Sequence, residues 1–596
     1  MELFRPIDLQ LRSPRPQLER SNWFSLDGDW AFALDPDGRW REPSQVQWDG
    51  TICVPFSPET AESGIGKTGY YRACWYRRAV APPPLPNDGR LVLHFEAVDY
   101  RATVWANGVR VADHDGGYSP FSVDLTLHAR DGEAIDLVVR AEDDPLDLAK
   151  PRGKQDWQLE PHSIWYPRTT GIWQAVWLEV LPPTWISALR WTPTMERWEM
   201  GVEAHIDGER RERLRLHVTL QAGGRLLADD TYSVVGGEVH RRIALSDPGI
   251  DDSRNELLWS PHSPTLVEAV LELWGDRGEL LDVVRSYTAL RSIAAEGDRL
   301  LLNGRPYTLR LVLDQGYWPA TGLTAPNDAA LKRDIELVRT MGFNGVRKHQ
   351  KVESQRYLYW ADVLGLLVWE EMPSAYRFTR ESVQRLVREW TAIIDRDYSH
   401  PSIIAWVPFN ESWGVPNLPS SPSERHYVQA LYHLTRTLDP TRLVVGNDGW
   451  ESVATDIIGV HDYDPDPDRI AIRYQAEEPR ERLFRRERPG GRALVLGGHT
   501  GQPLVLTEFG GIACGGGNDG TWGYCRAENG ADFAERYQRL MSTVNNLPYL
   551  AGFCHTQFTD TYQEANGLLR ADRTPKFPLE VVRLATLGLA AASEPR

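Results

Sequence analysis

Two glutamates, each placed at the end of an apolar stretch, are the residues of this chain best suited to chemistry. Glu411 follows Asn410 shortly after residues 403–407, whose continuous apolar run predicts a strand buried on both faces. Glu508 comes just after residues 504–506, a second run of the same kind. A carboxylate at the end of a buried strand is costly to desolvate, so we expect these two to serve a site. The alternative for Glu411 is a cap on the helix that follows.

The chain beyond about residue 289 alternates between short apolar stretches and longer stretches in which apolar residues have helical spacing. Eight strands with helices between them in about 300 residues predict a closed TIM (β/α)8 barrel over residues 289–596. We expect the strands at residues 308–312, 345–347, 366–369, 403–407, 443–445, 457–460, 504–506 and 550–553.

All strands of such a barrel end on one face, which is where β/α barrels carry out their chemistry. Glu411 would end the fourth strand and Glu508 the seventh, so their carboxylates can meet across the barrel mouth. Two carboxylates suit the cleavage of a glycosidic bond, because one donates a proton to the leaving oxygen while the other stabilises or attacks the reacting carbon. A separation of about 5 to 5.5 Å would indicate a retaining mechanism.

The part of the chain before the barrel has the pattern of two all-β domains. Short strand-like runs separated by turn pairs such as Asn107-Gly108 predict a jelly-roll β-sandwich over residues 1–182. Apolar and polar residues alternate over residues 214–220, as in a half-buried strand, and residues 183–288 fit one immunoglobulin-like β-sandwich. Pro182-Pro183 marks the expected boundary between the two domains.

Composition and charge limit the partners and the compartment of the protein. The net charge is −17, from 66 basic and 83 acidic residues without a basic cluster, so we expect no nucleic-acid partner. No apolar run approaches the roughly 18 residues of a membrane span, and residues 1–8 lack the apolar core of a secretory signal. The five scattered cysteines form no C-x-x-C pair, which indicates a cytoplasmic location and no structural zinc.

Beyond these patterns, the chain resembles the family 2 glycoside hydrolases, a family that includes β-galactosidases, β-glucuronidases and β-mannosidases. The resemblance covers nearly the whole chain and rests on the order of two sandwiches and a barrel, on Asn410-Glu411, and on further motifs. These motifs are Leu26-Asp27-Gly28-Asp29-Trp30, Gly342-Phe343-Asn344-Gly345-Val346-Arg347, Thr507-Glu508-Phe509-Gly510 and Asn566-Gly567-Leu568-Leu569. It implies an enzyme that hydrolyses O-glycosyl compounds without a metal or another cofactor.

The resemblance also implies a role for individual residues. Glu411 would be the acid/base and Glu508 the nucleophile of a retaining double displacement. Asn410 would hydrogen-bond the 2-hydroxyl of the sugar. Arg347 would keep Glu508 ionised by its charge, unless it only holds the barrel together, and His349 would lie near the sugar or one layer behind it. Further substrate-binding candidates lie at or just past strand ends, where side chains also tie loops together: Asp314, Glu371, His461, Tyr463, Trp413 and Gln557.

Two departures from the family bear on the identity of the sugar. The β-glucuronidases carry an Asn-x-Lys pair that holds the uronic carboxylate, whereas this chain has Glu564-Ala565-Asn566, where the acid should repel a uronate. We therefore expect an exo-acting hydrolase of terminal non-reducing glycosides that is most similar to a β-galactosidase, with a β-glucuronidase as an alternative. Residues 554–560 lack the Trp that many relatives place against the sugar, so a β-galactofuranosidase or α-L-arabinofuranosidase is a further alternative.

A carbohydrate is the expected partner in all of these cases. A non-catalytic carbohydrate-binding protein is the alternative of another class, and it predicts the loss of one strand-end glutamate, whereas both are present. A transglycosylase would pass the same intermediate to a sugar hydroxyl instead of water. The sequence leaves the oligomeric state open, a homo-oligomer included.

Overall fold

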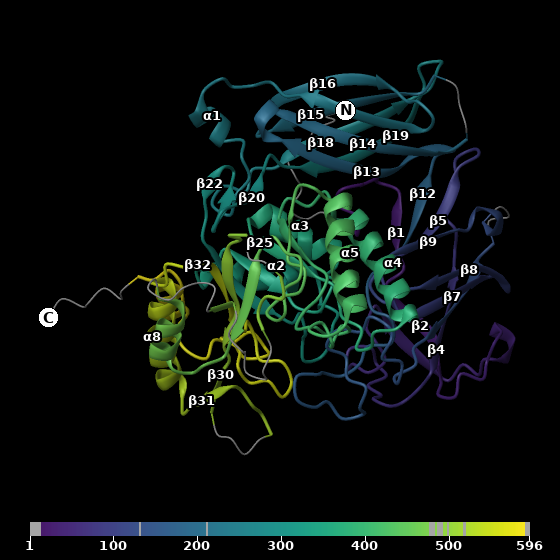
Figure 1. The fold of residues 1–596 in the computed structure, drawn as a ribbon. Helices are drawn as coiled ribbons and strands as arrows, with labels where there is room; N and C mark the ends of the chain where they lie inside the picture. Colours follow the sequence, from purple (N-terminus) through teal and green to yellow (C-terminus); the bar gives the residue numbers. More distant parts are fainter. Residues whose placement is uncertain are drawn as a thin grey trace.

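The computed structural model describes residues 13–129, 133–209, 213–475, 483–484, 493–497, 500–515 and 520–589. Residues 1–8, on which the expectation about a secretory signal depends, lie outside this part of the chain. Figure 1 follows the chain from a first β-rich domain through a second sandwich, which lies across the top of the view, to a barrel of strands and helices. Within the described residues, no helix has both the length and the apolar character that crossing a membrane requires.

The first domain is a β-sandwich whose two main sheets enclose an apolar core. Ile135, Leu137 and Val139 of one sheet pack with Leu91 and Leu93 of the other, and all five are buried. In the four-stranded sheet the order is β1 (Trp23–Ser25), β12 (Val176–Leu181), β5 (Arg90–Phe95) and β9 (Phe121–Asp124). In the six-stranded sheet it is β3 (Gly50–Val54), β2 (Gly28–Asp35), β4 (Ala73–Val80), β10 (Ile135–Glu142), β7 (Arg101–Ala106) and β8 (Val109–Asp115). A separate short pair joins β6 (Val98–Asp99) and β11 (Gly171–Ile172).

The second domain is also a β-sandwich, and its strands show the predicted alternation. Leu216, Val218 and Leu220 are fully buried in its core, because successive side chains of a strand point to opposite faces. One sheet has the order β13 (Thr184–Thr194), β14 (Glu199–Gly208) and β17 (Glu238–Ala244). The other has the order β16 (Arg225–Ser233), β15 (Arg215–Ala222), β18 (Val267–Trp274) and β19 (Leu280–Thr288). We propose domain boundaries at 1–182, 183–288 and 289–596.

One short helix, α1 (Asp251–Asn255), lies within the second domain between β17 and β18. A small sheet of β20 (Ile293–Glu296), β21 (Arg299–Leu302) and β22 (Arg305–Pro306) follows the second sandwich and precedes the first barrel strand.

The third part is a barrel of eight parallel strands, and each of the eight predicted strands is confirmed. The strands in spatial order are β27 (Leu443–Val444), β26 (Ile403–Val407), β25 (Leu367–Glu371), β24 (Gly345–Lys348), β23 (Leu309–Asp314), β32 (Leu550–Thr556), β29 (Leu504–Gly510) and β28 (Ile458–Asp462). No hydrogen-bonded ladder joins β27 to β28 among the described residues. β29 is longer than expected, so Glu508 lies inside a strand, whereas Glu411 lies in the turn after β26.

Helices cover the outside of the barrel and begin at the polar caps that their sequences provide. Asn327 accepts a hydrogen bond from the amide of Ala330 at the start of α2, and Thr379 accepts one from Ser382 at the start of α4. The helices are α2 (Asp328–Thr340), α3 (Gln355–Leu364), α4 (Arg380–Asp397), α5 (Pro422–Leu438), α6 (Pro467–Tyr474), α8 (Gly530–Asn545) and α9 (Leu579–Thr586). The short strands β30 (Ile512–Cys514) and β31 (Cys525–Ala527) pair beside the barrel.

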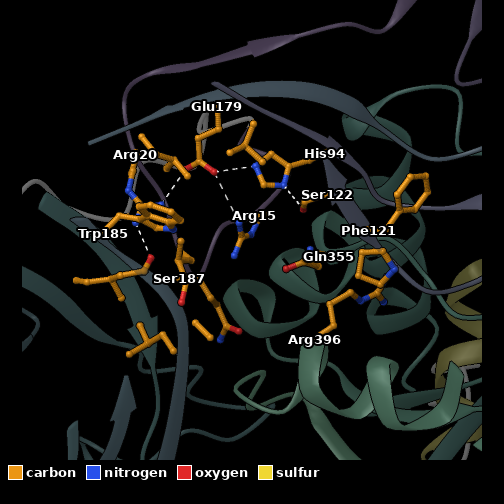
Figure 2. A pocket seen from close by; sticks show the side chains of 18 of the residues that line it. Arg15, Arg20, His94, Phe121, Ser122, Glu179, Trp185, Ser187, Gln355 and Arg396 are labelled. Atoms are coloured by element: carbon orange, nitrogen blue, oxygen red, sulfur yellow. Dashed lines mark hydrogen bonds and ion pairs between the residues drawn. The ribbon is translucent and has the colours of Figure 1, made fainter. Parts of the chain in front are cut away.

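A buried cluster of charged residues lies where the three parts of the chain meet, in a large pocket shown in Figure 2. Glu179 contacts three basic side chains: Arg20 at 2.8 Å, His94 at 3.0 Å and Arg15 at 3.7 Å. Arg20 also binds Asp282 of the second sandwich at 2.7 Å. Because these charges are mutually paired, we interpret this pocket as a joint between domains.

Candidate active site

The turn after β26 places Glu411 at the mouth of the barrel. Glu411 and Ser412 both have left-handed backbone conformations, with φ of 51° and 58°. Such conformations cost about 1 to 3 kcal/mol for a residue other than glycine and persist only where the surroundings fix them. Here the Glu411 amide donates to the carbonyl of Asp448 at 2.9 Å, and the Ser412 amide donates to the side chain of Asn447 at 3.0 Å.

Glu411 and Glu508 approach each other as predicted, and His461 of β28 lies between them. One carboxylate oxygen of each glutamate and one ring nitrogen of His461 all lie within 4.8 Å of one another. His461 Nδ1 is 2.7 Å from Glu411 Oε1, and its Nε2 is 3.4 Å from Glu508 Oε1 and 3.2 Å from Asp448 Oδ2. Burial disfavours the imidazolium, but the surrounding carboxylates outweigh burial and raise the pKa of His461 to about 9.

Arg347 of β24 is fully buried and connects several residues of the site. Its Nη1 is 2.8 Å from Glu508 Oε1 and 3.0 Å from Asp448, and its Nη2 is 2.8 Å from Glu371. Nη2 also donates to Asn410 Oδ1 at 2.6 Å. Burial alone would lower the pKa of Arg347, yet the acidic neighbours hold it well above its ordinary value. Arg347 therefore contacts the second carboxylate, as predicted, and also holds Asn410 in one orientation.

Tyr463 fixes the other oxygen of Glu508. Its hydroxyl donates to Glu508 Oε2 at 2.6 Å, and its ring stacks on Tyr524. Both carboxylate oxygens of Glu508 are thus held by cationic or hydroxyl groups, one by Arg347 and one by Tyr463. Fixed donors of this kind hold a carboxylate in one orientation.

A small pocket joins these residues at the barrel mouth. Four of the predicted residues line it, namely Glu411, Glu508, His349 and Tyr463. Burial, with the charges of Lys154 and Arg347, holds the pKa of His349 well below its ordinary value, so this side chain is neutral. The other lining residues are Lys154, Ile164, Leu313, Gln315, Tyr524, Thr556 and Glu564.

Seven of the nine predicted substrate-binding residues do not line this pocket. Three of them, Arg347, Asn410 and His461, belong to the network around the two glutamates described above. Asp314 pairs with Lys348 at 2.7 Å and accepts the Gly316 amide, so both of its oxygens are engaged within the barrel. Glu371 is fully buried between Arg347 and Gln350. The structure therefore places both carboxylates behind the site, because a buried acid takes a basic or amide partner wherever the fold supplies one.

Gln557 and Trp413 also lie beside the pocket rather than along its lining. The side-chain amide of Gln557 donates to Asn566 at 2.6 Å and to Glu564 at 3.1 Å. Trp413 packs near Trp165, with ring centroids 6.0 Å apart. Gln557 contacts the lining residue Glu564, and Trp413 lies under the lining residue Lys154. A direct contact with a sugar stays a prediction for both residues.

Five polar lining residues were not predicted as site residues from the sequence, namely Lys154, Gln315, Tyr524, Thr556 and Glu564. Gln315 comes directly after β23, so the reasoning from strand ends could have found it, and its Oε1 is buried without a hydrogen-bond partner within the described structure. Lys154 comes from the first domain, in a loop that no motif marks. A residue that reaches a site from another domain leaves no periodic signal in the sequence.

The cluster at the barrel mouth also has the composition of a metal site. Glu411, His461 and Glu508 offer one nitrogen and two oxygen ligands, a set that suits a divalent transition metal. A metal bound there would compete with the hydrogen bond between His461 and Glu411. The positive charge of His461 already compensates the negative charges of Glu411 and Glu508, so the cluster forms a stable ion-pair network without a metal.

A β/α barrel with two closely spaced carboxylates at its mouth has the architecture of a glycoside hydrolase. The chain belongs to the glycosyl hydrolases of family 2. Residues 24–182 match the family described as "Glycosyl hydrolases family 2, sugar binding domain", and residues 293–589 match "Glycosyl hydrolases family 2, TIM barrel domain". The resemblance predicted from motifs is thereby confirmed.

Several known proteins are similar to this chain. A protein of Formosa agariphila named "Putative beta-glucuronidase" is 26% identical over 415 residues, which cover 67% of this chain and 47% of that protein. The chain thus spans about half the length of this curated relative. The structure of Bacteroides uniformis β-glucuronidase 3 matches with a TM-score of 0.74 at 19% identity, covering 97% of this chain and 75% of that one. A family 2 β-galacturonidase of Eisenbergiella tayi bound to galacturonate matches with a TM-score of 0.72 at 21% identity, covering 96% and 98%.

Proposed function

We propose that this chain is a retaining, exo-acting β-glycosidase in which Glu508 is the nucleophile and Glu411 the acid/base. The observation that carries the proposal is the approach of the two carboxylates, because one oxygen of Glu411 and one oxygen of Glu508 lie within 4.8 Å of each other. Retaining enzymes hold the two groups about 5 to 5.5 Å apart, whereas inverting enzymes leave about 6.5 to 9.5 Å for a water molecule. The distance fits the first class.

The two steps of this mechanism use the contacts of the site. In the first step the carboxylic acid of Glu411 protonates the leaving oxygen while Glu508 attacks the anomeric carbon and forms a glycosyl ester. Arg347 and Tyr463 aim Glu508 and stabilise its charge before the attack. In the second step Glu411 removes a proton from water, which releases the sugar with its original anomeric configuration.

We further propose that the terminal sugar is a β-linked uronic acid. The relatives support this, because the three named above are a β-galacturonidase and two proteins named as β-glucuronidases. This choice replaces the β-galactosidase expected from the sequence and adopts the alternative. The expectation rested on Glu564, an acid where a uronate-binding group was looked for.

The surroundings of Glu564 remove much of that objection. The side chain is buried at the pocket wall and accepts a hydrogen bond from Gln557 at 3.1 Å. Burial raises the pKa of the Glu564 carboxyl above its ordinary value, although Lys154 acts in the opposite direction. A raised pKa widens the pH range in which the carboxyl is protonated, and in its protonated form it can donate a hydrogen bond to a uronate instead of repelling it.

The first experiment measures initial rates on five 4-nitrophenyl glycosides: the β-glucuronide, β-galacturonide, β-galactoside, β-galactofuranoside and α-L-arabinofuranoside. We expect a uronide to be the best substrate and Glu508→Gln to lose at least about a thousandfold in rate. Glu535→Gln, the same substitution at an exposed position of α8, should keep the wild-type rate. A preference for the galactoside or a furanoside would refute the assignment of the sugar, and no cleavage at all would favour a binding protein.

Azide separates the roles of the two glutamates. In Glu508→Ala, azide should take the place of the missing nucleophile and give a glycosyl azide of inverted configuration. In Glu411→Ala, azide should attack the glycosyl ester and give a product of retained configuration. Identical products from the two variants would contradict the assignment, and glycosyl transfer to an added sugar in the wild type would identify a transglycosylase.

A further inference from the structure

One lysine of the first domain reaches the site across the domain boundary. Lys154 lies in the segment between β10 and β11, residues 143–170, which packs on the barrel mouth. The amides of Arg152 and Gly153 both donate to the carbonyl of Ser374, at 3.0 and 3.2 Å. Further along the segment, the carbonyl of Ser163 accepts a hydrogen bond from the Trp522 side chain at 2.8 Å. These bonds to barrel loops fix the segment at both ends of the stretch that carries Lys154.

The ammonium group of Lys154 forms no ion pair in the described part of the chain, although its charge acts on the carboxyl of Glu564, which lines the same pocket. The residue is only 6% exposed, and its Nζ makes no ion pair or hydrogen bond with any described residue. It lies over the rings of Trp413 and Tyr166, at 5.3 and 5.9 Å from their centroids. A buried ammonium without an anion is costly, and contacts with aromatic faces offset only part of that cost.

The other buried lysines show what the fold does with such a charge. Lys150 pairs with Asp143, Lys348 with Asp314 and Glu353, and Lys351 with Glu353. Lys154 is therefore exceptional among the buried lysines that the structure describes. It also lines the pocket that holds Glu411 and Glu508. A cation left unpaired at the wall of a catalytic pocket points to an anionic group on the ligand.

We propose that Lys154 binds the carboxylate of the terminal uronic acid and so determines the specificity of the site for acidic sugars. This inference rests on the proposed function. With the anomeric carbon at Glu508, the remaining substituents of the sugar ring face the rest of the lining, which includes Lys154, Gln315 and Glu564. Lys154 supplies the charge for the sugar carboxylate, and the amide of Gln315 supplies a neutral hydrogen bond beside it.

The test compares two pairs of substrates that differ only in the carboxylate. These are the 4-nitrophenyl β-glucuronide with the β-glucoside, and the β-galacturonide with the β-galactoside. For Lys154→Met we expect the ratio of kcat/KM between the uronide and its uncharged partner to fall by about 10- to 100-fold, the loss of one charge-assisted contact. Lys154→Arg should keep most of the ratio. Lys67→Met, the same change at an exposed position of the first domain, should leave it unaltered.

The possible results separate the two proposals. If Lys154 only supports Trp413 and Tyr166, its loss will lower both members of a pair equally and leave the ratio unchanged, which would overturn the inference alone. If the wild type cleaves uncharged glycosides but no uronide, the proposed sugar is wrong and the inference fails with it. Calorimetry of free glucuronate and galacturonate with Glu508→Gln provides a check that needs no turnover. Adding Lys154→Met to that variant should weaken binding by about 10- to 100-fold, and unchanged binding would refute the inference.

Discussion

At the scale of single residues, the nucleophile is defined by what holds its two oxygens. Arg347 binds one oxygen of Glu508 at 2.8 Å, and Tyr463 donates to the other at 2.6 Å. The arginine is fully buried, so its charge acts through a medium that screens it weakly. Glu508 therefore needs little reorganisation before it attacks, which is how preorganised polar groups accelerate a reaction.

Tyr463→Phe should lower kcat by about 10- to 100-fold, because one hydrogen bond to a charged group is lost while the ring keeps its stacking on Tyr524. Initial rates on the best uronide would measure the effect. Tyr232→Phe removes a hydroxyl in the second sandwich and should leave the rate unaltered. An unchanged kcat in Tyr463→Phe would show that Arg347 alone is sufficient to hold the nucleophile.

The cluster of Glu411, His461 and Glu508 makes a prediction about metals. Both ring nitrogens of His461 lie within reach of carboxylates, and the proposed chemistry requires no metal. Dialysis against EDTA should leave kcat/KM unchanged. Added Zn²⁺ should inhibit, because it would compete for the two glutamates. Loss of activity in EDTA that Zn²⁺ or Mn²⁺ restores would instead identify a metal-dependent site.

At the scale of elements, the segment between β10 and β11 brings the first domain to the barrel mouth. Gly153 makes this approach possible, since it has a φ of 59° and a Cβ at this position would lie 2.3 Å from the carbonyl oxygen of Gln350. Only a residue without a Cβ fits such a contact without movement of the backbone. The position of Lys154 thus depends on its neighbour.

Gly153→Ala should displace the segment and lower kcat/KM for the uronide more than for its uncharged partner. Gly223→Ala is a matched control, because Gly223 has a similar φ of 54° with no atom within 4 Å of the added Cβ. Both variants carry the same backbone strain, so the difference between them isolates the clash with Gln350. Equal effects of the two substitutions on the uronide would argue that the segment does not position Lys154.

At the scale of the whole molecule, a cluster of paired charges lies where the three parts of the chain meet. Burial would raise the pKa of the Glu179 carboxyl, but the hydrogen bond from His94 and the charges of Arg15 and Arg20 lower it to about 2. A carboxyl with a lowered pKa stabilises the folded state above its unfolded pKa, and this contribution is lost as the pH falls through the folded pKa. The shift corresponds to about 3 kcal/mol at neutral pH.

Glu179→Gln should therefore lower the free energy of unfolding, and with it the thermal midpoint, at both pH 7 and pH 3. The loss of free energy at pH 3 should be about half the loss at pH 7, because the wild-type carboxylate is closer to protonation there. Scanning calorimetry at the two pH values would measure this. Glu528→Gln, at an exposed position, should have little effect at either pH. An equal loss at pH 7 and pH 3 would show that packing, rather than charge, makes Glu179 important.

The sequence by itself determined the three-part architecture, the eight barrel strands, and the pairing of Glu411 with Glu508. These features follow from local patterns, because apolar periodicity fixes an element and the barrel fixes which strand ends share a face. One contact between strand ends was also predicted correctly, since Arg347 reaches Glu508 as expected.

Only the tertiary structure decided which strand-end residues are free to meet a ligand. Asp314 and Glu371 have the same pattern in sequence as the lining residues, but the fold gives them buried basic partners. It also placed Lys154 in the pocket from a distant domain and left its charge unpaired. Charge compensation depends on distances between segments far apart in the chain, and no local pattern encodes those distances.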